Sequence, residues 1–185
     1  ALTAVVTIVL GMGMPTPSAY ILAAALMAPI LTKLGIPTMG AHMFVLYYAV
    51  MSALTPPVAV AAYAASSIAE DNPLYIALLA VKFALAAFII PFAFIFGPEL
   101  LMNGAPMEIL FSFATAVVGL IIIAAAAEGY FTEPLSAPIR FILVAAGLTL
   151  VAPNTIASGI GVVLASVTLG PAIYRKFISR SSDLS

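Results

Sequence analysis

The chain has 185 residues, of which 64% are hydrophobic and 7% are charged, and its formal net charge is −1. A soluble domain carries about 25% charged residues, so this composition excludes a water-facing globular surface and indicates an integral membrane protein solvated by the lipid bilayer. The near-neutral charge excludes a nucleic-acid partner, and the lack of cysteine excludes disulfides and thiolate metal sites.

The first predicted element is a re-entrant helical hairpin over residues 1–33. The stretch Leu2–Thr32 carries no charge, yet it is too long for one level span of about 20 residues. Its middle, Gly11–Pro17, reads GMGMPTP, where proline removes amide donors and glycine weakens the helix. Two half-length helices that meet at a tip explain this pattern. Because Ala1 stands inside an apolar stretch, we expect a fragment of a longer protein, and favour this over a complete small membrane protein.

The second predicted element is a discontinuous membrane helix over residues 42–69. It is again too long for one level span, and Thr55-Pro56-Pro57 stand at its centre. Adjacent prolines cannot both sit in a regular helix. We therefore expect one half that ends at Leu54, a non-helical joint, and a second half from Val58.

Four further apolar segments follow, separated by short polar turns. We expect membrane helices over 74–96, 109–127, 138–152 and 156–174. The segment 138–152 is short, so it either spans a thinned bilayer or pairs with the next helix. The predicted fold class is thus an all-α integral membrane protein, with a hairpin and broken helix in 1–101 and additional helices in 102–185.

The basic residues set the predicted orientation. Arg175, Lys176 and Arg180 form a basic tail after the last helix, which favours a cytoplasmic C-terminus in a multi-pass protein. Counting back through the helices puts the Glu70–Pro73 turn in the cytoplasm and the Lys33–Gly40 loop outside.

Two broken helices at membrane depth indicate solute transport. Lipid offers no hydrogen bonds, so an unwound backbone survives there only where it lines protein or water. In secondary transporters, half-helix N-termini face anions and unwound carbonyls coordinate Na⁺. We favour a binding site over simple packing kinks, because hydroxyl residues flank both breaks and because we expect carbonyls there to be freed. The hydroxyls belong to Thr16, Ser18, Ser52 and Thr55, and the carbonyls to Gly11, Met12, Ser52 and Leu54.

The motifs at these breaks resemble a known family. Gly11-Met12-Gly13-Met14-Pro15-Thr16, Ser18-Ala19-Tyr20, Ala41-His42-Met43-Phe44 and Ser52-Ala53-Leu54-Thr55-Pro56-Pro57-Val58-Ala59 resemble the large permease subunit of TRAP transporters. More narrowly, they resemble the fused permeases of the TAXI subgroup. Pro91-Phe92-Ala93-Phe94 and Pro98-Glu99-Leu100-Leu101 continue the likeness, which is specific over 1–101 and mainly hydropathic beyond.

The resemblance implies an inner-membrane importer of an organic anion, typically a carboxylate, driven by an ion gradient, usually Na⁺. It implies a periplasmic substrate-binding protein of TAXI type as partner. This chain would be the C-terminal half of the permease, without the first repeat and the small-subunit region. By analogy, the candidate Na⁺ ligands are Gly11, Met12, Gly13, Thr16, Ser52, Leu54 and Thr55, and the substrate would contact Gly13, Pro15, Thr16, Ser18, Thr55, Pro56 and Pro57.

Two rival functions stay open at the level of the sequence. One is another Na⁺- or H⁺-coupled carrier with broken helices, and the other is a non-transporting structural membrane subunit. No enzyme is expected, since the predicted spans hold neither Asp71 nor Asp183, and no Gly-x-Ser-x-Gly turn is present. No cofactor is expected besides a coupling ion.

Several polar residues have a structural and a functional interpretation. For His42, capping or bonding a loop carbonyl is favoured over proton coupling. Lys82 is expected to snorkel to the interface, with a pair to Glu70 or Asp71 as the alternative. Arg140 is read as an interfacial anchor. Glu128 and Glu133 are read as solvated, and Tyr47 and Tyr48 either pack in the bundle or face the interface.

Overall fold

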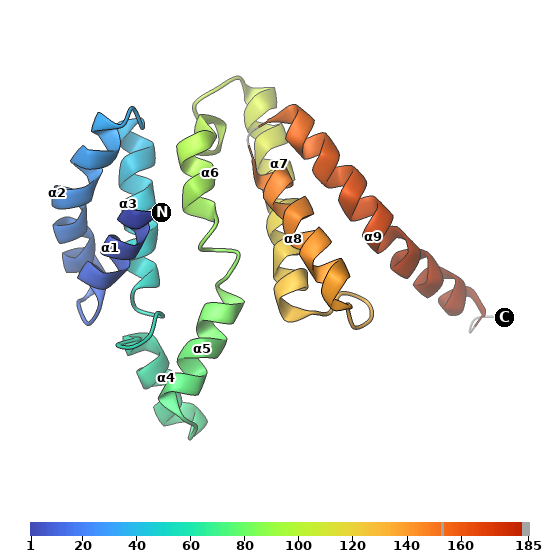
Figure 1. The fold of residues 1–185 in the computed structure, drawn as a ribbon, viewed down its shortest axis with the longest axis horizontal. Coiled ribbons are helices and arrows are strands. Elements are labelled where there is room, and N and C mark those ends of the chain that lie inside the picture. Colours follow the sequence, from blue (N-terminus) through green and yellow to red (C-terminus); the bar gives the residue numbers. More distant parts are fainter. Residues whose placement is uncertain (153, 183–185) are drawn as a thin grey trace. The chain divides into compact units, whose positions relative to one another are not determined.

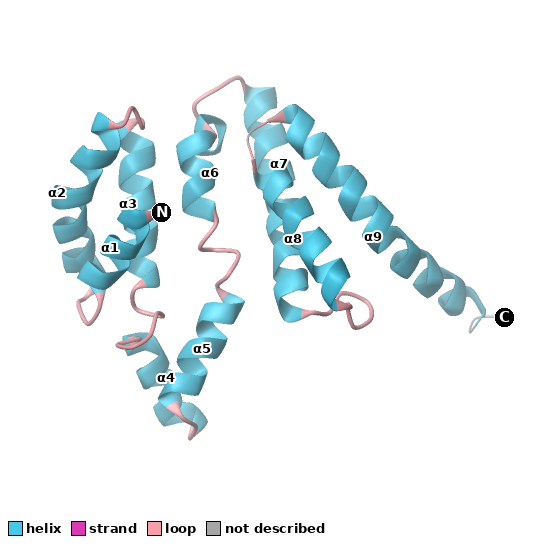
Figure 2. Ribbon diagram, viewed as in Figure 1, coloured by secondary structure: helices cyan, strands magenta, loops and turns pink. Residues whose placement is uncertain are grey.

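The computed structural model describes the backbone of residues 1–152 and 154–182, and the side chains of 1–152 and 154–170. Within these residues the fold consists of nine α-helices and one 3-10 helix, without a strand (Figure 2). The prediction of an all-helical chain is therefore confirmed. The chain divides into two compact units, Ala1–Met102 and Asn103–Ser185, and each is described here by itself.

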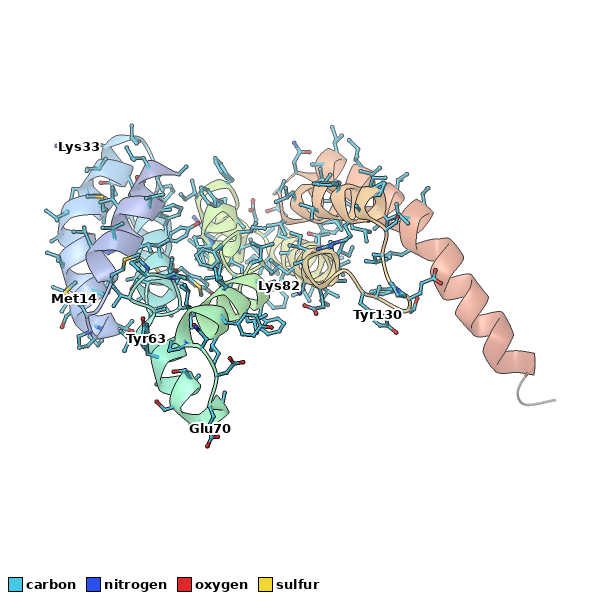
Figure 3. All side chains as sticks on the ribbon, turned by 60° about the horizontal axis from the view of Figure 1, so that its bottom comes forward. Met14, Lys33, Tyr63, Glu70, Lys82 and Tyr130 are labelled. Carbon is cyan, nitrogen blue, oxygen red and sulfur yellow. The ribbon has the colours of Figure 1, made fainter. Side chains whose placement is uncertain are left out.

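The first unit opens with a helical hairpin formed by α1 (Leu2–Gly11) and α2 (Thr16–Lys33) (Figure 1). The turn needs Gly13, because its φ of 77° lies in the left-handed region that L side chains rarely adopt. Pro17 occupies the first turn of α2, where its missing amide would have no helical partner. In Figure 3, Met14 in the turn and Lys33 at the end of α2 lie at opposite ends of this hairpin.

The next helical segment is interrupted in its middle. Helix α3 (Thr38–Met51) is followed by turns over Ser52–Ala59 and then by α4 (Val60–Ala69). The proposed start at residue 42 is wrong, since Pro37 stands at the N-cap and the helix begins directly after it. The peptide bond between Pro56 and Pro57 is cis, and Ala59, which precedes α4, has a left-handed φ of 35°.

The prediction of one helix over 74–96 is wrong, because this segment is also interrupted. The structure has α5 (Pro73–Phe83), a series of turns over residues 84–89, and α6 (Ile90–Phe96), followed by the 3-10 helix η1 (Pro98–Leu101). Pro91 has no amide hydrogen, so the carbonyl of Ala87 cannot receive its usual helical bond. The amides of Ala87 and Ile89 turn to carbonyls three residues back, at 2.8 and 3.1 Å.

Helix α3 is the centre of the first unit. It packs against α1, α2 and α6, and it supplies the buried residues Phe44, Val45 and Tyr48. The ring of Phe44 meets those of Tyr48 and Phe92 edge-on, with centroid distances of 4.8 and 5.3 Å. Edge-to-face pairs are a favoured aromatic geometry, so this cluster fixes α3 against α6.

Helices α4 and α5 pack on each other through small residues. Ala59, Ala62 and Ala77 are buried between them. The side chain of Asn72 caps α5 by accepting hydrogen bonds from the amides of Leu74 and Tyr75, at 2.9 and 3.3 Å. Figure 3 labels Glu70 at the turn that precedes this cap.

The second unit is built from α7 (Pro106–Glu128), α8 (Ala137–Val151) and α9 (Thr155–Ser182), which pack in sequence order. Glycines bring the backbones close. A Cβ at Gly119 would lie 2.8 Å from the Gly147 carbonyl oxygen, and one at Gly161 would lie 2.8 Å from that of Ala146. Such close approach is typical of membrane helices, where small residues replace a hydrophobic driving force.

Two predictions for the second unit need correction. The last helix does not end at 174, since α9 continues to Ser182 through the basic tail. The side chains of Arg175, Lys176 and Arg180 lie outside the described residues. Arg140 is not only an interfacial anchor, because its Nε and one Nη donate to the carbonyls of Ala126 and Ala127, at 2.8 and 3.0 Å. These carbonyls end α7 and lack helical partners, so Arg140 caps that helix from α8.

By length and composition, one described helix, Pro106–Glu128, could cross a membrane by itself. Several other apolar helices are shorter, and in the first unit the breaks account for this. Large apolar side chains are exposed on many of them, including Ile68, Leu2, Phe83 and Ile156. These exposed faces suit a bilayer, where an apolar side chain meets lipid instead of water.

Candidate functional site

The hairpin turn and the interrupted helix meet in the structure. Gly11, the last residue of α1, packs directly against Ser52, the first residue after α3. A Cβ at Gly11 would lie 2.5 Å from Ser52 Oγ and 2.9 Å from Ser52 Cβ, so only glycine fits. The fold thus joins two breaks that lie about forty residues apart in the sequence.

The same two segments also approach each other at Gly13. A Cβ at Gly13 would lie 3.5 Å from Cγ1 of Val58, which is an ordinary van der Waals contact. We call the region formed by residues 11–18 and 52–59 the tip–joint site. It contains no charged side chain, so its polarity comes from hydroxyls and backbone groups.

The hydroxyls of Ser52 and Thr55 in the joint donate hydrogen bonds to carbonyls at the end of α3. Ser52, which is 1% exposed, donates to the Ala49 carbonyl at 2.7 Å. Thr55 is partly buried and donates to the Met51 carbonyl at 2.8 Å. Because each proton is used, the oxygen lone pairs remain to accept a hydrogen bond or to ligate a cation.

The carbonyls of the breaks are less free than predicted. The Gly11 carbonyl accepts from the Met14 amide at 3.2 Å, and that of Ser52 accepts from the Thr55 amide at 3.3 Å. Both breaks are tight turns and not fully unwound chain, which is why these bonds persist. The carbonyls of Met12 and Leu54 receive no backbone hydrogen bond from the described residues.

The hairpin side of the site is more open than the joint side. Pro15, Pro17 and Ser18 are exposed, whereas Thr16 is half-buried. On the joint side, Thr55 and Pro56 are half-buried and Pro57 is exposed. Residues proposed to contact substrate are therefore the accessible part of the region, and Gly11 and Ser52 lie beneath them.

Two helices begin at these breaks without a side-chain cap. Helix α2 starts at Thr16 and α4 starts at Val60, and neither N-cap side chain accepts a hydrogen bond from the first turn. In α4, however, the amides of Ala61 and Ala62 already donate to the carbonyls of Ala53 and Ala59, at 3.0 and 2.9 Å. At the start of α2, the amides of Thr16 and Ser18 have no partner among the described residues, so they and the positive end of the helix dipole are able to bind an anion. The site can thus offer oxygens to a cation and amides to an anion.

Sequence reasoning missed Thr7, which lies one helical turn before Gly11 on the same buried face of α1. Thr7 is 0% exposed, and its hydroxyl oxygen has no hydrogen-bond partner among the described residues. The spacing of Ala4, Thr7 and Gly11 indicates a helix face. It does not reveal that the hydroxyl lacks a partner, because that depends on packing.

The polar residues outside the site have mostly structural environments. His42 lies in the second turn of α3, and its Nδ1 is 2.9 Å from the hydroxyl of Tyr20 on α2, so the expected loop-carbonyl partner is wrong. Tyr48 is buried and donates to the Phe88 carbonyl at 2.7 Å, whereas the Tyr47 ring packs edge-on against Phe94. Both tyrosines therefore pack within the first unit.

Lys82 lies in the last turn of α5 and its side chain is exposed. Glu128 ends α7, and Glu133 lies in the loop before α8; both are exposed. None of these three charged residues belongs to the tip–joint site.

Comparison with known proteins identifies the first unit. The family model for the tripartite ATP-independent periplasmic transporter, DctM component, matches residues 1–105. This range contains the hairpin, the interrupted helix and the whole tip–joint site. No curated protein and no solved structure matches the chain.

The family is one of transporters and not of enzymes, and its members are inner-membrane components. It implies a substrate-binding protein and a small subunit as partners. Since the matched range covers more than half of the 185 residues, the chain belongs to the DctM component family of the tripartite ATP-independent periplasmic transporters.

Proposed function

We propose that this chain is the C-terminal part of the permease subunit of a TAXI-like importer. It moves an organic anion, a carboxylate, into the cell, and the Na⁺ gradient drives this import. The substrate arrives on a periplasmic binding protein of TAXI type, and the permease is completed by a first repeat and a small-subunit region. The observation that supports this most is the contact of Gly11 with Ser52, which joins two helix breaks into one site.

In this proposal the cation binds on the buried side of the tip–joint site. Its ligands come from Gly11, Met12, Gly13, Thr16, Ser52, Leu54 and Thr55. The Ser52 and Thr55 oxygens keep free lone pairs, and the Met12 and Leu54 carbonyls have no backbone partner among the described residues. Neutral oxygens without a carboxylate suit a monovalent hard cation, because a divalent ion would lack compensating charge in a membrane interior.

The carboxylate binds on the accessible side of the same site. Its contacts are Gly13, Pro15, Thr16, Ser18, Thr55, Pro56 and Pro57, together with the uncapped amides of Thr16 and Ser18 at the start of α2. A cation bound beneath an anion offsets its charge, so each ligand favours the other. This mutual stabilisation provides ion coupling, because reciprocal coupling free energy is what links two binding sites.

The hairpin is re-entrant in this proposal, with its turn inside the membrane at the level of the joint. A helix break at that depth requires a protein or water environment, and each break provides part of it for the other. The C-terminus lies in the cytoplasm. A cysteine at Ser182 should then resist impermeant thiol reagents in intact cells, and rapid labelling would reverse this topology.

The central test is Na⁺-driven uptake by the complete permease in proteoliposomes, with its binding protein supplied outside. Ser52→Ala and Thr55→Ala each remove one ligand oxygen, and we expect the Na⁺ concentration for half-maximal uptake to rise at least tenfold. Thr115→Ala is the matched control, because the Thr115 hydroxyl bonds only to the carbonyls of Phe111 and Ser112 of its own helix. An unchanged Na⁺ dependence in both site variants, or full uptake with choline in place of Na⁺, contradicts the proposal.

A further inference from the structure

We propose that the Thr7 hydroxyl is a ligand of the coupling cation, on the inner wall of the tip–joint site. This inference rests on the proposed function and adds one residue to the site. Thr7 is 0% exposed, and its Oγ1 has no partner among the described residues. Buried hydroxyls are nearly always hydrogen-bonded, so one that is not needs a specific explanation.

The side chain of Thr7 differs from those of four partly buried threonines in this protein. A threonine in a helix commonly donates its proton to the carbonyl four residues before it. Here three helical threonines do so, Thr115 to Phe111, Thr149 to Ala145 and Thr168 to Leu164, and Thr55 in the turns after α3 bonds to Met51 in the same way. Thr7, which is more deeply buried than any of these four, makes no such bond to Thr3. Its hydroxyl is therefore available to a ligand.

Thr7 lies one helical turn from Gly11, the first residue of the tip–joint site. Thr7 and Gly11 are four residues apart on the buried face of α1, about 6 Å along the helix axis. Gly11 touches Ser52, whose oxygen has free lone pairs. Two oxygens that share a hard cation lie up to about 5 Å apart, twice a ligand distance of about 2.5 Å. One helical turn is about 1 Å longer than that span, so the proposal requires the Ser52 oxygen to lie on the Thr7 side of Gly11.

The absence of a side chain at Gly11 supports the same conclusion. A side chain there would clash with Ser52, so glycine allows α1 to approach the Ser52 hydroxyl closely. This close approach brings the Ser52 oxygen to the face of α1 that also carries the Thr7 hydroxyl. Both are neutral hydroxyls, which suits a monovalent cation and not a divalent one.

The test compares Thr7→Val with Thr7→Ser in the complete permease. Valine keeps the shape and removes the oxygen, whereas serine keeps the oxygen. We expect Thr7→Val to raise the Na⁺ concentration for half-maximal uptake at least fivefold, and Thr7→Ser to stay within twofold of the parent. A second readout that does not require transport is the Na⁺-induced rise in melting temperature of the purified permease, which Thr7→Val should abolish. Thr32→Val is the control, since the Thr32 hydroxyl bonds to the Pro29 carbonyl away from the turn.

If Thr7 only packs in the core and does not bind the cation, Thr7→Val should give a different result. Removing an unpartnered buried hydroxyl then raises the melting temperature in choline and leaves the Na⁺ response unchanged. If Thr7→Val does not fold, Thr7→Cys replaces the oxygen with a soft sulfur, and the same loss of Na⁺ response is expected. If Ser52→Ala and Thr55→Ala change Na⁺ dependence while the Thr7 variants do not, this inference fails alone. If no variant changes it, the proposed cation site fails.

Discussion

The phenolic hydroxyl of Tyr48 on α3 donates a hydrogen bond to the backbone carbonyl of Phe88, at 2.7 Å. In a continuous helix this carbonyl would accept from the amide of Phe92, but that amide bonds to Ile89 at 3.0 Å. Tyr48 therefore satisfies an acceptor that the interruption between α5 and α6 leaves open. A third break in the first unit is stabilised by a side chain from the helix at its centre.

Removing this hydroxyl should destabilise the first unit. In Tyr48→Phe the Phe88 carbonyl is left without a partner in apolar surroundings, which costs about 1–3 kcal/mol. We expect a lower melting temperature for the purified permease. Tyr47→Phe is the control, because the Tyr47 ring packs on Phe94 and its hydroxyl makes no hydrogen bond to the described residues. An equal loss in both variants would show that the bond to Phe88 is not the cause.

A methyl group at Gly11 should separate the two breaks. Gly11→Ala brings its Cβ against the side chain of Ser52, and overpacking of this kind costs about 1–3 kcal/mol. The double variant Gly11→Ala with Ser52→Gly should recover most of the melting temperature, since the obstructing atoms are gone. Gly159→Ala is the control: nothing lies within 4 Å of its Cβ, so it should be neutral or stabilising. Failure of the double variant to recover would contradict the contact.

The bond between Tyr20 and His42 should tie the second arm of the hairpin to α3. A double-mutant cycle with Tyr20→Phe and His42→Leu should give a coupling energy of about 0.5–1.5 kcal/mol, measured by chemical unfolding in detergent. Tyr48→Phe combined with His42→Leu serves as the control pair. Tyr48 bonds to Phe88 and not to His42, so the effects of the two control substitutions on the free energy of unfolding should add. A coupling energy of equal size in the control pair would contradict a specific bond between Tyr20 and His42.

The cap that Arg140 places on α7 should stabilise the second unit. Arg140→Met removes two charge-assisted bonds to the carbonyls of Ala126 and Ala127, each worth about 1.5–3 kcal/mol. Arg140→Lys should recover only part of the loss, because an ammonium does not reproduce the planar fork of a guanidinium. Melting temperature again measures the effect. A lysine variant as stable as the parent would indicate that charge alone is sufficient.

The sequence was informative where backbone chemistry alone determines structure. Glycine and proline clusters at Gly11–Pro17 and Thr55–Pro57 mark two interruptions, because these residues act through their own dihedral angles and missing amides. The interruption before α6 was missed. Its only local sign is Pro91 near a helix end, and its stabilising partner is Tyr48, about forty residues earlier in the chain.

Side-chain partners were harder to predict for the same reason. The carbonyls of Gly11 and Ser52 retain turn bonds that a count of prolines cannot show. Arg140 lies near a helix start in the sequence, yet its function as a cap depends on how the loop returns α8 to the end of α7. The bond of His42 to Tyr20 and the unpartnered hydroxyl of Thr7 likewise follow from tertiary packing.

The fit of Gly11 against Ser52 also bears on how this protein can diverge. Gly11 and Ser52 share one small volume, so a larger residue at position 11 should appear in homologous chains only beside a smaller residue at position 52. Correlated substitutions at positions 11 and 52 would then be the evolutionary consequence of the contact between Gly11 and Ser52.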